Sequence, residues 1–161
     1  MDEPMTRVEA LYREHGPAIL NYLRRRCADG GWAEDLLHET FARALRQVDR
    51  LDEVRSPKAW LLGIARNVWR GARRGRRRTR SLPHDLAAES PARDDPRLEQ
   101  MRRALDALPD AFREVLELRL REELSYEEIA NVLGIPVGTV RSRLHHAVRR
   151  LQEMMSRDHD V

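Results

Sequence analysis

Little in this sequence could cross-link the chain, build a sheet or cross a membrane. Cys27 is the only cysteine among 161 residues, which excludes an intramolecular disulfide and a cysteine-based zinc site. Aromatic residues make up 5% of the chain while Ala, Leu, Arg and Glu are abundant, so the composition predicts an all-α fold. No run of about 18 apolar residues occurs, and the first residues form no basic, apolar leader. We therefore expect a cytoplasmic protein with no direct membrane insertion.

Apolar spacing and proline divide the chain into three parts. Residues 1–80 carry helical periodicity with few breaks, and a second periodic block follows in residues 98–161. The segment SLPHDLAAESPARDDP between them has three prolines, no aromatic residue and no sustained apolar spacing. The sequence thus predicts two small helical domains joined by a flexible linker over residues 81–97.

The first domain is predicted to contain three helical segments. Apolar residues from Val8 to Leu23 indicate a helix, or a helix pair interrupted near Gly16-Pro17, which Gly30-Gly31 ends. A second helix is expected from about residue 33 to 48, with an apolar stripe on one side. Its opposite face is suited either to water or to a partner, and it carries Glu34, Asp35, His38, Glu39, Arg43 and Arg46.

The third segment combines a clear start signal with one basic face. Ser56-Pro57 supplies an N-cap followed by proline at the first helical position. The face opposite its apolar stripe carries Gly63, Arg66, Asn67, Arg70, Arg74 and Arg77. The end of this helix, RGARRGRRRTR over residues 70–80, contains no acidic residue. Such a dense positive block indicates either a nucleic-acid surface or a solvated tail.

The second domain ends in two short, closely spaced helical segments. Before them, Pro109 is expected to open a helix with Phe112, Val115, Leu116 and Leu120 facing inward. Ser125 with Glu128 then forms a capping box, Gly134 stops the helix, and Thr139 is the expected N-cap of the next one. That last helix turns basic and short polar side chains outward, which is typical of a helix-turn-helix but also fits a plain helical hairpin. Those outward or flanking residues are Arg141, Ser142, Arg143, His145, His146, Arg149 and Arg150.

No set of residues predicts catalysis, a metal or a cofactor. His38-Glu39 has part of a zinc-protease spacing, but Ala42 stands where the second histidine would be needed. No phosphate-binding glycine loop and no nucleophile elbow are present, so we expect a protein that is not an enzyme.

The chain resembles the extracytoplasmic function (ECF) class of bacterial RNA polymerase sigma factors, which consist of sigma regions 2 and 4. Four stretches in the same order carry the resemblance: AEDLLHETFARAL, SPKAWLLGIARN, ALPDAFREVLELR and LSYEEIANVLGIPVGTVRSRL. The resemblance implies that residues 1–80 bind core polymerase and recognise and melt the minus-10 element. It implies that residues 98–161 read the minus-35 element.

The resemblance also implies which residues make these contacts. The clamp helices of the largest core polymerase subunit would meet Asp35, His38, Glu39 and Arg43. The minus-10 element would meet Arg55, Trp60, Asn67, Arg70, Arg73 and Arg74. The minus-35 element would meet Thr139, Arg141, Ser142, Arg143, His145, His146 and Arg149.

Partners follow from the same resemblance. A cognate anti-sigma factor is expected, with the protein monomeric when free or bound 1:1 to this inhibitor. Two other functions stay open from the residues themselves. One is a one-component helix-turn-helix regulator, and the other is a helical interaction module with an incidental basic tail.

Overall fold

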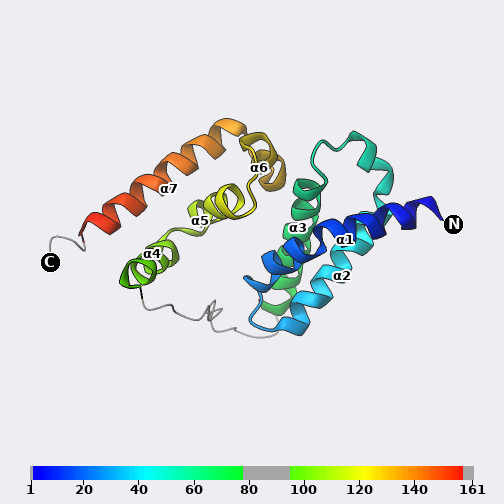
Figure 1. Cartoon of the computed structure of the whole chain (residues 1–161), viewed down its shortest axis with the longest axis horizontal. Helices are drawn as coiled ribbons and strands as arrows, with labels where there is room; N and C mark the ends of the chain where they lie inside the picture. Colours follow the sequence, from blue (N-terminus) through cyan, green and yellow to red (C-terminus); the bar gives the residue numbers. More distant parts are fainter. Residues whose placement is uncertain (1, 78–94, 158–161) are drawn as a thin grey trace. The chain divides into compact units, whose positions relative to one another are not determined.

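The computed structural model describes residues 2–77 and 95–157, and all regular structure in these ranges is helical. The all-α prediction is thereby confirmed. The chain divides into two compact units, residues 1–88 and 89–161, which are described separately below. In chain order the elements are α1 (Glu3–Arg24), α2 (Gly30–Arg46), the 3-10 turn η1 (Val48–Glu53), α3 (Pro57–Arg77), α4 (Pro96–Ala107), α5 (Asp110–Leu116), the π turn η2 (Glu117–Arg121), α6 (Tyr126–Leu133) and α7 (Val137–Arg157) (Figure 1).

The first unit is a bundle in which α1, α2 and α3 pack against one another. Its centre is aliphatic, with one tyrosine and one threonine among the most deeply buried side chains. Thr40 was missed by the apolar pattern, and it is accommodated because its hydroxyl donates to the Leu36 carbonyl oxygen at 2.7 Å. The largest fully buried side chains of this unit are Ile19, Tyr22, Leu23, Thr40, Leu61 and Leu62.

Of the two arrangements expected for the start of this unit the single helix is observed, and the expected helix stop at Gly30-Gly31 is wrong. Helix α1 runs uninterrupted through Pro17, because only the Arg13 carbonyl loses its helical donor and Arg13 lies on the exposed side, where water can serve it. Gly30 and Gly31 do not end α1; they are the first residues of α2. Asp29 caps α2 there, since its Oδ1 accepts from the Gly31 N–H at 2.8 Å.

In the second unit, α7 packs against α4, α5 and α6. The core includes Leu118, Leu124, Ile129 and Val140, each at most 2% exposed. Pro96 and Arg97, counted with the linker in the sequence prediction, lie in the first turn of α4, where Asp95 is the N-cap. Residues 78–94, which include most of that predicted linker, lie outside the described residues.

The π turn η2 includes a residue that the sequence prediction placed inward. The Glu122 N–H donates to the Glu117 carbonyl five residues back, at 3.2 Å, and the Leu124 N–H donates to the Leu118 carbonyl at 3.1 Å. Leu120, predicted inward, is 71% exposed, whereas Leu118 is fully buried. Val148, also expected in the core, is 44% exposed on α7.

Candidate nucleic-acid interface

The polar face of α2 carries paired charges. Asp35 and His38 are exposed, while Glu39 and Arg43 are half-buried. Arg43 Nε donates to Glu39 Oε1 at 3.0 Å, and Arg46 Nη1 lies 4.0 Å from the same oxygen. The structure thus brings the four predicted α2 residues to one accessible face, where the carboxylates precede the guanidinium groups along the helix.

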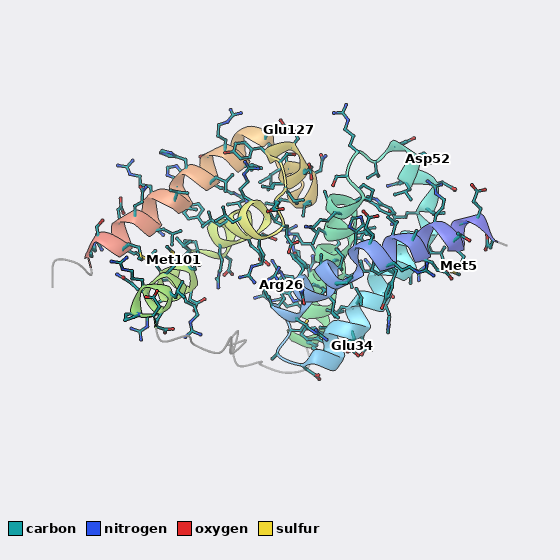
Figure 2. All side chains as sticks on the ribbon, in the orientation of Figure 1. Met5, Arg26, Glu34, Asp52, Met101 and Glu127 are labelled. Atoms are coloured by element: carbon teal, nitrogen blue, oxygen red, sulfur yellow. The ribbon has the colours of Figure 1, made fainter. Side chains whose placement is uncertain are left out.

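The start of α3 is fixed by its cap and by the turn before it. Ser56 Oγ accepts from the Ala59 N–H at 3.2 Å, which confirms the predicted N-cap. Residues 50–53, expected as loop, belong to the 3-10 turn η1, which Arg7 holds through Asp52 at 2.6 Å. Arg26 and Glu34 lie at one end of this unit and Asp52 at the other (Figure 2).

The predicted minus-10 residues extend from this start along α3. Arg55 precedes the helix and is exposed, and Trp60 is half-buried in its first turn. Asn67 lies seven residues further on, two helical turns along the same side, and is exposed. The structure places these three side chains at accessible positions, in the order in which a single strand could meet them.

The second half of α3 presents arginines that are not neutralised. Arg70 and Arg74 are exposed and Arg73 is half-buried. Within the described residues none of these three forms an ion pair with a carboxylate. A polyanion such as a nucleic-acid backbone would meet an arginine surface here without having to displace an internal partner.

Aromatic rings, which the sequence prediction did not include in the site, lie against the arginines at this end of the unit. The Arg73 guanidinium carbon is 5.2 Å from the centroid of the Trp69 ring, and that of Arg26 is 5.7 Å from it. Arg76 stacks 3.7 Å above the ring of Trp32 at the start of α2. The sequence signal for these contacts was the tryptophans themselves, but pairing them needed the arrangement of the three helices.

Cys27 lies buried beside this arginine surface. Burial is the largest cause that raises the pKa of its thiol to about 11, against the opposing effect of Arg76 and Arg26. The thiol is therefore neutral near pH 7 and has little nucleophilic character, in agreement with the inert residue expected from sequence.

The first helix of the helix-turn-helix in the second unit, α6, has the predicted N-cap and C-cap residues. Ser125 Oγ accepts from the Glu128 N–H at 3.1 Å. Gly134 ends α6 in the left-handed region at φ 65°, where glycine has no side-chain clash, and the Ile135 N–H closes on the Ala130 carbonyl at 3.1 Å. The expectation that Thr139 caps α7 is wrong. The helix begins at Val137, and the Thr139 N–H already bonds to the Pro136 carbonyl at 3.0 Å.

The outward face of α7 keeps most of the predicted residues accessible. Arg141, Ser142, His145, His146 and Arg149 are exposed, whereas Arg143 and Thr139 are half-buried. The ring of His146 stacks on Phe112 of α5 at 6.2 Å and lies 5.6 Å from that of His145. Arg149 Nε is 3.7 Å from Glu153 Oε1, so the far end of the face is partly neutralised. In the part of the chain that the structure describes, the arginines in the first two turns of α7 have no carboxylate partner.

The described residues show no group of three or more potential metal ligands placed to hold an ion. In the same ranges, no helix combines the length and the apolar character that a membrane span requires.

Comparison with known proteins identifies the family of the two units that carry the basic faces. Residues 11–79 match the family described as Sigma-70 region 2, and residues 104–153 match Sigma-70, region 4. The chain belongs to the sigma-70 family.

Relatives narrow this to ECF RNA polymerase sigma factors, the class to which the chain belongs. It is 34% identical over 155 residues to the ECF sigma factor SigL of Mycobacterium tuberculosis, covering 90% of this chain and 86% of SigL. It is 36% identical over 159 residues to the ECF sigma factor SigE of Mycolicibacterium smegmatis, covering 92% of this chain but 62% of SigE. The solved structure of RpoE from Bartonella quintana in complex with the anti-sigma factor NepR is similar, with 27% identity, a TM-score of 0.60 and coverage of 90% of this chain and 96% of that one. The resemblance inferred from four sequence stretches is confirmed.

Proposed function

We propose that this ECF sigma factor binds core RNA polymerase through α2 and directs it to promoters by separate contacts with the minus-10 and minus-35 elements. The observation that carries the proposal is the presence of one basic, accessible helical face in each unit, α3 in the first and α7 in the second. A single-site regulator would need only one of them. The chemistry of RNA synthesis belongs to polymerase, and this chain contributes binding and strand separation, not a reaction of its own.

Core binding is assigned to the mixed-charge face of α2. Asp35, His38, Glu39 and Arg43 would meet the clamp helices of the largest polymerase subunit. The Glu39–Arg43 pair supports this assignment because an ordered pattern of both signs can be matched by a protein surface of complementary pattern.

Minus-10 recognition is assigned to the loop before α3 and to the helix itself. Arg55, Trp60 and Asn67 would contact bases of the displaced strand, and Arg70, Arg73 and Arg74 would follow its phosphates. Unstacking a base costs a few kcal/mol. Aromatic stacking and a cationic groove each offset part of that cost, so recognition and strand opening would be coupled.

Minus-35 recognition is assigned to α7 of the helix-turn-helix. Arg141, Ser142, His145 and His146, which are exposed, would meet base edges or phosphates in a major groove, with Thr139, Arg143 and Arg149 at its margins. The His146 stack on Phe112 orients its ring, so this histidine would reach the DNA in a defined direction.

The remaining partners follow from the class. RpoE of Bartonella quintana is bound to the anti-sigma factor NepR in its solved structure, and we infer a cognate anti-sigma factor here, with a monomer as the free state and a 1:1 inhibited complex. The place of action is the cytoplasm, where polymerase and promoter DNA meet.

In vitro transcription tests the proposal. Adding the protein to bacterial core polymerase on genomic templates of its own organism should give discrete, promoter-dependent transcripts that core alone does not make. Binding to DNA without any new transcript would instead support the one-component regulator, and no binding to either polymerase or DNA would support a helical interaction module.

A further inference from the structure

One tryptophan of α3 lies between an arginine of the same helix and an arginine of the segment that follows α1. Trp69 is half-buried, and its ring centroid lies 5.2 Å from the guanidinium carbon of Arg73 on α3 and 5.7 Å from that of Arg26 just after α1. Arg26 also stacks at 3.6 Å on the ring of Tyr22, which is fully buried. A continuous stack thus connects the core of the first unit to the arginine surface of α3.

An aromatic ring and a carboxylate can both fix the conformation of an arginine side chain, but only the carboxylate neutralises its charge. A free arginine side chain loses rotamer entropy when it is fixed by a ligand. Glu39 orders Arg43 in advance but cancels its charge. Trp69 orders Arg73 through its electron-rich face and leaves the charge intact, and the edge of the guanidinium group keeps its hydrogen-bond donors.

We propose that Trp69 is a positioning residue that holds Arg73 for a phosphate of promoter DNA and does not itself contact the DNA. This inference rests on the proposed function, because it requires Arg73 to bind the displaced strand. Trp32 provides the same kind of support for Arg76, whose guanidinium carbon is 3.7 Å from the ring centroid. The α3 surface is therefore preorganised by aromatic rings contributed by two of the three helices of this unit.

Substitution of the ring separates this role from general packing. Trp69→Leu retains apolar bulk but loses the aromatic face, and should lower the rate of promoter opening by the full-length protein with core polymerase by about two- to fivefold. Trp69→Phe retains a smaller aromatic face and should recover most of that loss. Arg73→Lys keeps the charge but loses the planar stack, so it should slow promoter opening as much as Trp69→Leu does. This variant tests the same contact if Trp69→Leu folds poorly.

A double-mutant cycle with Arg73→Ala identifies the route by which Trp69 acts. If Trp69 works through Arg73, adding Trp69→Leu to Arg73→Ala should change opening by less than about 1.5-fold. Tyr12→Leu is the matched control, because the Tyr12 ring lies on Phe41 at 4.9 Å, away from the arginine stack. That control should open promoters at the normal rate.

Two results would overturn the inference. Multiplicative effects of Trp69→Leu and Arg73→Ala would mean that Trp69 contacts DNA itself or supports another residue, and a normal opening rate for Arg73→Lys would mean that stacking is irrelevant. Both differ from failure of the proposed function, in which Arg73→Ala alone would leave opening unchanged.

Discussion

The faces of α2 and α3 carry arginines at similar helical spacing but differ in whether carboxylates lie beside them. On α2, Glu39 accepts from Arg43 and lies near Arg46. On α3, Arg70, Arg73 and Arg74 have no carboxylate partner within the described residues. Exposed ion pairs add little stability, so the difference is better explained by what each face binds. A patterned face suits a protein partner, and a face of uniform charge suits a polyanion.

Reversing the carboxylates of α2 should have the largest effect. In Asp35→Arg with Glu39→Arg, the face becomes predominantly basic and meets its polymerase partner with like charge, which costs several kcal/mol. Affinity for core polymerase in a pull-down or fluorescence titration should fall about 1,000-fold. Glu9→Arg with Glu14→Arg changes the net charge equally on the exposed side of α1 and should bind normally. Unchanged core binding by the α2 variant would remove this face from the interface.

The Cys27 thiol reports whether variants of either face leave the underlying helix junction packed. Its pKa of about 11, against an ordinary 9.0, lowers the thiolate fraction at pH 8 by about 100-fold relative to the unfolded chain. Alkylation by iodoacetamide should therefore be at least about 100-fold slower in the native protein than in urea. The folded state holds its proton up to higher pH, so this protection should be lost as pH rises through 11. Fast native labelling at pH 8 would contradict the buried position.

Removing the unpaired charges of α3 should change the salt dependence of DNA binding. Arg70→Ala, Arg73→Ala and Arg74→Ala together should reduce the log-log slope of affinity against salt by up to about 0.7 to 0.9 for each phosphate that is no longer neutralised. At low salt, promoter opening should fall about 30-fold if each arginine–phosphate interaction is worth about 0.7 kcal/mol. Alanine at Arg13, Arg50 and Arg157 removes the same charge from other exposed positions and should have little effect. An unaltered slope of affinity against salt in the α3 variant would mean that these arginines are solvated and do not contact DNA.

A carboxylate placed on α3 would convert its face into one like that of α2. Arg70→Glu lies three and four residues before Arg73 and Arg74, the spacing that favours pairing on a helix. It should therefore slow promoter opening about three- to tenfold more than Arg70→Ala, because two neighbouring arginines lose available charge. Equal effects of Arg70→Ala and Arg70→Glu would show that pairing does not weaken the face. Arg13→Glu, on the exposed side of α1, is the control for net charge.

Local sequence signals predicted the caps and much of the core. Ser56, Ser125 and Gly134 act as expected because capping depends on residues within one turn. Signals with two local outcomes were less reliable. Gly30-Gly31 opens a helix because Asp29 caps it, and Pro17 remains inside α1 because the following turns are anchored in the core.

Contacts between helices could not be predicted from spacing. The ring contacts of Trp32 and Trp69 depend on where α1, α2 and α3 cross, and no periodic pattern encodes them. Leu120, predicted inward from helical spacing, is exposed. The assignments of individual side chains to polymerase or to promoter bases stay predictions, since they depend on partners as well as on this fold.

The number of residues in the π turn η2 determines the direction in which its side chains point about the helix axis. Each residue of an α-helix advances about 100° around the axis, so deleting one residue from Glu117–Arg121 would leave enough chain to bridge α5 and α6. It would nevertheless turn the later residues of η2 away from the directions they now face, ahead of the non-helical residues 122–125. Insertions and deletions here would change the direction in which side chains point about the helix axis, more than the distance that the chain spans. A loop of the same length could accommodate them by changing its conformation.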